Sequence, residues 1–275
     1  ARGGSRSSTI EDVIEKANQV ADSGVKEIVL TGVNTGDFGI RNGKREDRFI
    51  DLVRALEKRA HVGRIRISSI EPNLLTDEII EFVADSNKFV PHFHIPLQSG
   101  SDKVLRQMKR RYLTPLYTSR IAKIREYMPD ACIGVDVIVG FPGESEADFM
   151  ETYRYLNELD ISYLHVFTYS ERPNTPAIDY DDSVEMKERH RRSKMLRILS
   201  EKKRRAFYEK EIGKTRTVLF EEDIEDGLMF GYTENYIRIG ARYDPLRVNE
   251  KIEVVLSNIH ALGYVEVTEP VLSYH

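Results

Sequence analysis

Six polar or charged side chains lie within or just after short apolar runs of the sequence, near the points where strands are predicted to end. In chain order they are Asn34, Glu71, Gln98, Ser99, Asp136 and Arg172. The Asn34 amide can donate and accept hydrogen bonds, the Glu71 carboxylate can accept from a ribose or an amino group, and Arg172 can clamp a carboxylate. Because functional groups of a parallel barrel gather at the carboxyl ends of its strands, these residues predict a ligand-binding site. On spacing alone, a plain turn around Asn34 and an ordinary loop position for Glu71 remain alternatives.

Asp136 differs from the other candidates because it places a charge inside the apolar run Ile133–Val139. Burying an unpaired carboxylate is costly, so Asp136 needs a partner or a ligand. The run continues into Gly140-Phe141-Pro142-Gly143-Glu144, which leads to the start of a predicted helix. A helix N-terminus favours an anionic group, although a Gly-x-x-Gly spacing is not specific by itself.

His92 and His94 are two residues apart on a predicted strand, so their side chains point to one face. A metal site would need at least a third ligand, and none lies near them in the sequence. We therefore interpret both as core or barrel-lining histidines and predict no metal ligands. The sequence contains no nucleophile elbow, phosphate-binding loop or zinc motif, so it identifies no catalytic residue.

Strand and helix patterns alternate through the first two hundred residues. The predicted strands are Glu27–Leu30, Arg64–Ser68, Val90–Ile95, Ile133–Val139 and Tyr163–Phe167. The predicted helices span 9–23, 49–60, 76–85, 145–159 and 184–211, with a helical hairpin at 101–128. Strands that are each followed by a helix favour an α/β fold with a parallel barrel or sheet.

After Gly213 the pattern changes to short β-rich runs separated by turn residues. These runs cover 216–220, 228–232, 236–239, 252–256 and 262–267. Five short strands in such a short segment predict a small β-barrel of the oligonucleotide-binding kind. We place the domain boundary near Phe207, which gives expected domains at 1–206 and 207–275.

The length, net charge and cysteine count limit the classes of protein to which this chain can belong. The chain has 275 residues, a net charge of −4 and one cysteine. A single cysteine excludes an internal disulfide and fits a reducing compartment, so we expect a cytoplasmic protein without a membrane partner. The segment Ala1–Ser8 has neither an initiator methionine nor an apolar signal region, and we expect the chain to be a fragment of a longer protein.

The net charge of the whole chain does not indicate a nucleic-acid partner, so any such contact must come from local basic stretches. Two stretches are candidates. The first has Lys103, Arg106, Lys109, Arg110, Arg111, Arg120, Lys123 and Arg125. The second has Arg189, Arg191, Arg192, Lys194, Arg197, Lys202, Lys203, Arg204 and Arg205, and it leads into the predicted β-barrel. Basic helices are often only solvated faces, but the second stretch favours contact with an RNA backbone. Tyr232, Tyr236 and Tyr243 are candidates for stacking on bases or, alternatively, for the barrel core.

Several segments, taken together and in this order, resemble a known family. They are Arg2-Gly3 with Ser5-Arg6-Ser7, residues 30–37 (LTGVNTGD), 96–101 (PLQSGS), 140–144 (GFPGE), and Tyr169-Ser170-x-Arg172-Pro173-x-Thr175-Pro176. The combination resembles the radical S-adenosylmethionine methylthiotransferases, which modify tRNA or a ribosomal protein. The form of residues 31–37 is most similar to the branch that acts on N6-threonylcarbamoyladenosine beside the tRNA anticodon.

The resemblance implies a partial parallel (β/α) barrel of radical SAM type, followed by a small all-β TRAM barrel that binds RNA. It implies S-adenosylmethionine (SAM) as a cofactor, with [4Fe–4S] clusters in the intact protein, and places the six candidate residues around the SAM and cluster pocket. The implied partners are the tRNA anticodon stem-loop, bound through the TRAM domain and the basic helices, an electron donor and a sulfur source.

The cysteine count departs from the family pattern. The resemblance implies a C-x3-C-x2-C loop and a first barrel strand upstream of Ala1, but the chain contains only Cys132. We therefore expect the chain as given to be inactive, and we interpret Cys132 as a buried apolar residue. Two alternatives stay open, namely an enzyme that modifies a ribosomal-protein aspartate and a non-catalytic protein that binds SAM or RNA.

Overall fold

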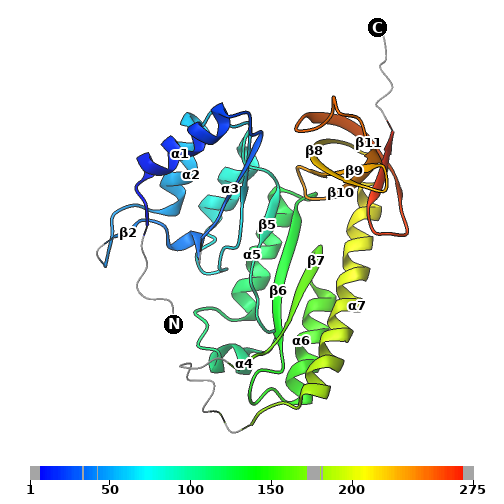
Figure 1. Ribbon diagram of the computed structural model, residues 1–275. Helices are drawn as coiled ribbons and strands as arrows, with labels where there is room; N and C mark the ends of the chain where they lie inside the picture. Colours follow the sequence, from blue (N-terminus) through cyan, green and yellow to red (C-terminus); the bar gives the residue numbers. More distant parts are fainter. Residues whose placement is uncertain (1–6, 33, 42, 172–179, 181, 269–275) are drawn as a thin grey trace.

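The computed structural model describes residues 7–32, 34–41, 43–171, 180 and 182–268. It contains a curved parallel sheet covered by helices and a small closed β-barrel (Figure 1). The strands of the sheet are β1 (Glu27–Leu30), β4 (Arg64–Ile67), β5 (His92–His94), β6 (Cys132–Val139) and β7 (Tyr163–Thr168). The predicted α/β class and all five predicted strands are therefore confirmed.

The five strands lie side by side as one parallel layer, made of a two-stranded and a three-stranded sheet. β1 pairs with β4, and β6 pairs with β5 on one side and β7 on the other, always in parallel. Parallel bridges from Ile65 to Phe89 and from Ser69 to His94 join β4 to β5. The spatial order therefore follows the chain order, as expected for successive strand–helix units that wind in one direction.

The helices agree closely with the sequence pattern. They are α1 (Ile10–Asp22), α2 (Phe49–Arg59), α3 (Asp77–Asp85), α4 (Asp102–Gln107), α5 (Thr114–Tyr127), α6 (Glu146–Glu158) and α7 (Met186–Glu211). The short helix η1 (Thr35–Asp37) and the hairpin of β2 (Ile40–Arg41) and β3 (Lys44–Arg45) were not predicted. The helical hairpin predicted at 101–128 corresponds to α4 and α5.

Alternate side chains of each strand separate the two faces of the sheet. Ile65, Phe93, Val135 and Val137 point to the helices and are fully buried, because a parallel strand covered by helices needs apolar residues on that side. The residues between them, such as His94 and Asp136, face the concave side, where exposure is higher. The sheet thus presents its polar side chains to its concave face.

The start of α6 is fixed by a capping box. The Ser145 hydroxyl accepts from the Asp148 amide, and the Asp148 carboxylate accepts from the Ser145 amide. Loss of such a cap costs about 1 kcal/mol, so Ser145→Ala is expected to lower the free energy of unfolding by about that amount in urea titrations. Ser119→Ala, on an exposed helix surface, is the matched control and should change it by less than about 0.5 kcal/mol.

The small barrel has five strands and closes on itself. They are β8 (Thr215–Glu225), β9 (Leu228–Thr233), β10 (Arg238–Arg242), β11 (Lys251–Ile259) and β12 (Val265–Thr268), in the order β10-β12-β11-β8-β9. The barrel has its own apolar core, which includes Val218, Met229, Ile239 and Leu256. Its closure confirms the predicted all-β barrel.

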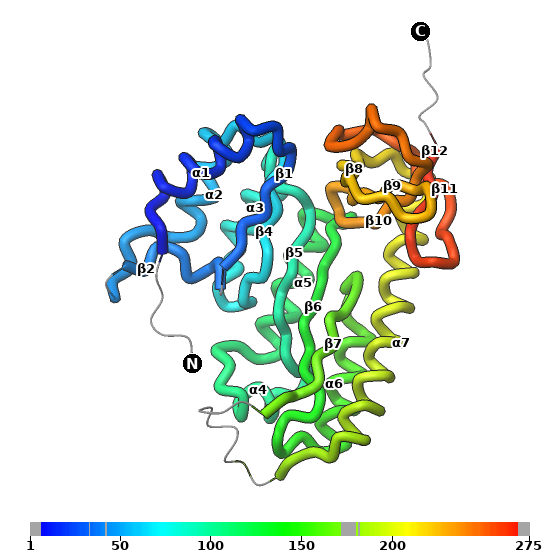
Figure 2. Tube along the Cα trace, in the orientation of Figure 1, coloured from blue at the N-terminus to red at the C-terminus, as the bar shows by residue number. Residues whose placement is uncertain are grey.

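Helix α7 connects the two parts (Figure 2). It packs along β7, and its last two turns contribute Phe207 and Tyr208 to the core of the small barrel. The boundary that we expected near Phe207 therefore falls inside a continuous helix. Among the described residues, no helix is both long and apolar enough to cross a membrane.

The small barrel covers the amino-terminal end of the parallel sheet. Arg64 donates to the Thr217 carbonyl at 2.7 Å, and Arg66 donates to the Glu234 carbonyl at 3.2 Å. Both arginines are buried, and both pair with Glu27, at 3.4 Å and 3.0 Å. This contact leaves the opposite end of the sheet, where the strands finish, uncovered by the barrel (Figure 1).

Candidate functional site

Buried polar atoms without a partner occur mainly in the segments that follow the parallel strands, at the edge of the sheet where the strands end. Among the described residues, such atoms are Asn34 Oδ1, Asn73 Oδ1, His92 Nδ1, Gln107 Oε1, Arg110 Nε, Glu144 Oε1 and the Tyr169 hydroxyl. All except His92 lie in a segment that follows β1, β4, β5, β6 or β7. Since an unsatisfied buried polar atom costs about 1–3 kcal/mol, this edge is suited to a polar ligand that supplies the missing partners.

Asn34 and Glu71 occupy this edge, as predicted. The Asn34 amide nitrogen donates to the Asp37 carboxylate at 3.2 Å, which leaves its buried carbonyl oxygen unpaired. Glu71 forms an ion pair with Arg110 at 3.2 Å. The pair is partly exposed, so it can exchange one partner for a ligand group. Arg110 was placed in a basic surface stretch by the sequence, and only its contact with Glu71 identifies it as part of this edge.

Gln98 and Ser99 form the turn after β5. Gln98 has a positive φ of 74°, which costs a non-glycine residue about 1 kcal/mol or more, and its backbone bonds to Asp136 and Ile138 hold it there. The Ser99 hydroxyl is fully buried and lies 3.1 Å from the Thr152 hydroxyl of α6. Ser99 therefore ties the turn to α6. Arg172, the sixth candidate, lies outside the described residues.

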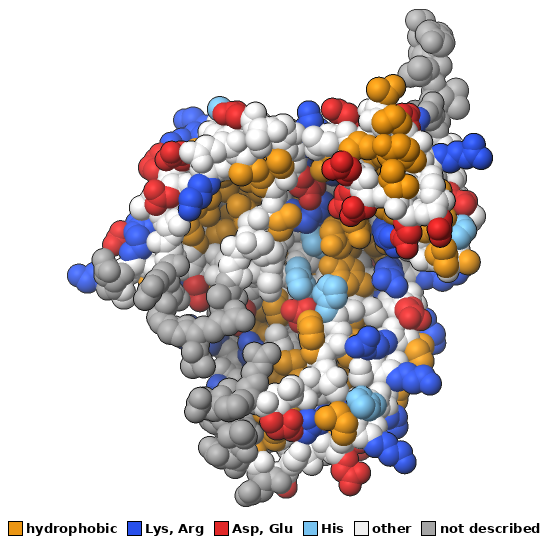
Figure 3. All heavy atoms as spheres, in the orientation of Figure 1, with side chains coloured by type: hydrophobic (Ala, Val, Ile, Leu, Met, Phe, Trp, Pro, Cys, Tyr) orange, Lys and Arg blue, Asp and Glu red, His pale blue; other side chains and the backbone are white. Residues whose placement is uncertain are grey.

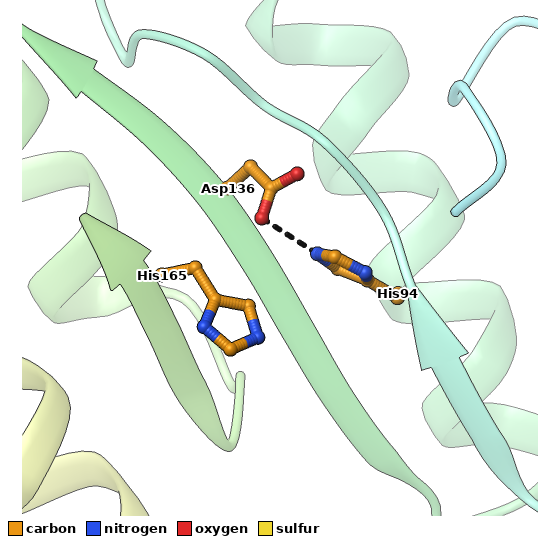
Figure 4. Close-up of side chains that lie close together, drawn as sticks. All are labelled: His94, Asp136 and His165. Carbon is orange, nitrogen blue, oxygen red and sulfur yellow. Dashed lines mark hydrogen bonds and ion pairs between the residues drawn. The ribbon is translucent and has the colours of Figure 1, made fainter. Parts of the chain in front are cut away.

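Asp136 does find a partner, in the middle of the concave face and not at its edge. Its Oδ1 lies 2.7 Å from His94 Nε2, and His165 of the neighbouring strand β7 points toward the same place (Figure 4). The sequence analysis missed His165. The two-residue period of Tyr163, His165 and Phe167 could have placed it on this face.

A cavity of about 330 Å³ lies between the concave face and the small barrel. Figure 3 shows a group of histidine side chains in this hollow, between the two parts of the molecule. Tyr236 stacks on His92 with ring centroids 4.3 Å apart and on Tyr232 at 4.7 Å. These two tyrosines, predicted to stack on bases or to lie in the core, thus line the cavity between the sheet and the small barrel. Burial lowers the pKa of His92 well below its usual value and also lowers the pKa of His165.

In the segment Gly140–Glu144, the Glu144 carboxylate takes the position that an anionic ligand would need. Glu144 accepts from the Gly140 amide at 2.6 Å and from Arg192 of α7 at 2.8 Å. Burial raises the pKa of Glu144, and the Arg192 cation opposes this rise. The sequence analysis predicted that the start of α6 would favour an anionic ligand. In the structure this helix start is already capped by Ser145.

The second basic stretch divides into buried and exposed residues. Arg189 and Arg192 are buried and paired with Glu171 and Glu144, so the expectation that they face a partner is wrong. Within the second basic stretch, the exposed cations without a carboxylate partner among the described residues are Lys194, Arg197, Lys202 and Arg204. We call these four the α7 stripe. At about 3.6 residues per turn they cover roughly half of the helix circumference.

Cys132 is buried on β6, as its interpretation as an apolar residue expected. Burial raises the pKa of its thiol to about 12, so the thiol stays protonated at neutral pH, and a protonated thiol is a poor nucleophile and metal ligand. We expect a disulfide reagent at pH 7 to label the native chain at least about 100-fold more slowly than the chain in urea, where the thiol titrates near 8.5. Similar labelling rates in both states would contradict this burial.

Comparison with known proteins identifies relatives for most of the chain. Residues 1–156 match the family described as the Radical SAM superfamily. The chain is 42% identical over 244 residues to a threonylcarbamoyladenosine tRNA methylthiotransferase of Bacillus subtilis (strain 168), covering 87% of this chain and 54% of that protein. A tRNA-2-methylthio-N(6)-dimethylallyladenosine synthase of Vesicomyosocius okutanii is 34% identical, with 93% and 58% covered. The chain spans about half the length of the curated relatives it matches.

The fold also matches a solved structure. A radical S-adenosylmethionine methyltransferase from Kitasatospora setae, with cobalamin and a [4Fe–4S] cluster bound, aligns with a TM-score of 0.52 at 15% identity. The alignment covers 62% of this chain and 30% of that protein. At this identity the match shows a shared fold only.

The radical SAM superfamily implies SAM and a [4Fe–4S] cluster as cofactors. The unpaired polar atoms at the strand ends fit SAM, whose amino, carboxylate and hydroxyl groups need donors and acceptors. The cluster does not fit the residues present, because the chain has one cysteine and its thiol is buried on β6.

Proposed function

We propose that this chain, which belongs to the radical SAM superfamily, serves an enzyme that adds a methylthio group to N6-threonylcarbamoyladenosine beside the tRNA anticodon. The observation that carries this proposal is the 42% identity, over 87% of the chain, to a relative of that name. The TGVNTGD form of residues 31–37 supports the same substrate branch.

In this proposal the strand ends bind SAM, which supplies the methyl group and the reactive species of the reaction. The Asn34 carbonyl and the Glu71 carboxylate accept from hydroxyl or amino groups, and Arg110, freed from Glu71, or Arg172 pairs with the carboxylate. Gln98 and Ser99 shape the turn that borders the ligand. Asp136 is held by His94, farther from the edge.

For tRNA recognition we propose that two domains with different roles meet at the boundary predicted from the sequence. Residues 1–206 bind SAM and the reacting base, and residues 207–275 form the TRAM domain, which contacts the anticodon stem together with the α7 stripe. The stripe supports this assignment because its four cations are exposed and have no carboxylate partner among the described residues. Such cations are free to pair with phosphates.

We further propose that the 275-residue chain is inactive by itself, because it has no thiolate set for the cluster. After anaerobic treatment with iron, sulfide and a reductant, the chain with SAM is expected to yield no 5′-deoxyadenosine above the background without protein. Its formation in stoichiometric amounts would contradict the proposal. In the cell, we expect an electron donor and a sulfur source as further partners, all in the cytoplasm.

Binding measurements with the chain test the substrate class. We expect fluorescence anisotropy to show tighter binding to an anticodon stem-loop than to an RNA hairpin of the same length with a different loop. A peptide with the modified aspartate of a ribosomal protein is the competing substrate. Tighter binding of this peptide than of the stem-loop would contradict tRNA as the substrate.

A further inference from the structure

We propose that His94, Asp136 and His165 form a binding site for a divalent transition-metal ion of the Zn²⁺ or Fe²⁺ class. The site lies within strands β5, β6 and β7 on the concave face of the sheet. The residues to which we assign SAM lie in the segments that follow the strands. The inference does not rest on the proposed function, because it follows from the position of three side chains.

The three residues come from three neighbouring strands. β6 pairs directly with β5 and β7, and Asp136 is the register partner of His165. One ligand atom from each side chain lies within 4.8 Å of the others. In a tetrahedral site with bonds of about 2.0–2.1 Å, ligand atoms lie roughly 3.4 Å apart. His165 must therefore move slightly inward and the 2.7 Å contact of His94 with Asp136 must open slightly, and side-chain rotations achieve both.

Free ligand atoms are present at this place. Within the described part of the chain, the two ring nitrogens of His165 have no hydrogen-bond partner. The second carboxylate oxygen of Asp136 has none either. A His–Asp pair alone would explain two of the residues. The His165 ring packs edge to face against His94 and Tyr163, but its nitrogens would still lack a hydrogen-bond partner beside the pair (Figure 4). A shared ion gives all three side chains a common partner.

The kind of ligand indicates the class of ion. Two imidazoles and one carboxylate suit Zn²⁺ and Fe²⁺, whereas Mg²⁺ and Ca²⁺ prefer oxygen ligands alone. The nearby cation Arg66 is paired with Glu27 at 3.0 Å, so its charge is partly balanced, and Glu221 lies on the same cavity wall. The local charge therefore does not exclude a dication.

The cavity leaves room for a further ligand. His94 and His165 line it, and three protein ligands leave a tetrahedral ion with one open position. A water molecule or a substrate oxygen can take that position from the cavity side. The site thus has the form of an exchangeable centre and not of a closed structural one.

Metal titration of the 275-residue chain tests the inference. After removal of metal with a chelator, we expect isothermal titration calorimetry to show one tight Zn²⁺ site per chain, and Co²⁺ to give the visible bands of a four- or five-coordinate centre. His94→Ala, Asp136→Asn and His165→Ala should each weaken Zn²⁺ binding by at least about 100-fold, since even losing a group that only orients a ligand costs 10–100-fold.

Matched variants separate loss of a ligand from loss of fold. His190→Ala removes an exposed imidazole of α7 and should leave Zn²⁺ binding unchanged. Asp136→Asn keeps the size of the side chain, and circular dichroism of each variant checks that it remains folded. Absence of a tight site, or binding that survives all three substitutions in folded variants, would overturn the inference. The proposed function would stand in either case, because neither tRNA nor SAM enters this experiment.

Discussion

Replacing the four cations of the α7 stripe (Lys194, Arg197, Lys202 and Arg204) with alanine is expected to weaken binding of an anticodon stem-loop at least about tenfold at about 50 mM salt. Each phosphate contact contributes roughly 0.7–0.9 to the slope of log K against log salt concentration, so the slope should fall by about 3. Anisotropy titrations at several salt concentrations measure both quantities.

A control with the same change in net charge separates local contact from long-range attraction. Lys16, Lys44, Arg54 and Lys58 are also exposed, on α1, β3 and α2, at the other side of the sheet. Their replacement by alanine should leave the slope nearly unchanged. If both quadruple variants lose the same affinity and the same slope, the α7 stripe is not the RNA-binding surface.

Glu211→Ala is expected to lower the free energy of unfolding by about 1–3 kcal/mol, the cost of leaving a buried hydrogen-bonding group without its partner. Glu211 ends α7, is almost completely buried, and accepts from Lys214 at 2.7 Å, from Arg216 and from Asn235 at 3.0 Å. Its loss leaves the buried Asn235 amide without this acceptor, whereas Arg216 and Lys214 keep the Asp130 carboxylate as a partner, at 2.7 Å and 2.8 Å. Urea unfolding followed by circular dichroism measures the effect.

Two further variants sharpen this result. Glu209→Ala removes an exposed carboxylate of the same helix, paired with Arg205 at 2.9 Å, and should cost no more than about 1 kcal/mol. Glu211→Gln keeps an acceptor but not the charge, so its cost should lie between the two. A Glu211→Ala variant as stable as Glu209→Ala would show that this network does not fasten the small barrel to α7.

The elements of the fold were predictable because their signals are local. The apolar run 133–139 and the spacing of the helical residues depend on neighbours in the sequence, and the structure has strands and helices at nearly the same residues. The closed order of the small barrel was not predictable strand by strand. It depends on pairings between residues far apart, such as Ile239 with Val265.

The site was less predictable because its contacts join distant segments. The side chain of Arg66 reaches carbonyls 167 and 168 residues further along the chain, and no local pattern announces such a contact. From the sequence, Arg189 and Arg192 belong to an exposed basic helix face. In the structure both are buried and paired with Glu171 and Glu144. His94 was judged to lack further metal ligands, because Asp136 and His165 are its neighbours only in the folded sheet.

Nucleoside analysis of tRNA by mass spectrometry tests the central claim most directly. Deleting the gene that encodes this chain from its source organism should remove the methylthio derivative of N6-threonylcarbamoyladenosine and leave its unmethylthiolated precursor, and the restored gene should return it. If this nucleoside persists while methylthio-dimethylallyladenosine or a methylthiolated ribosomal aspartate is lost, the proposed substrate is wrong. If none of these modifications changes, the chain does not serve a methylthiotransferase.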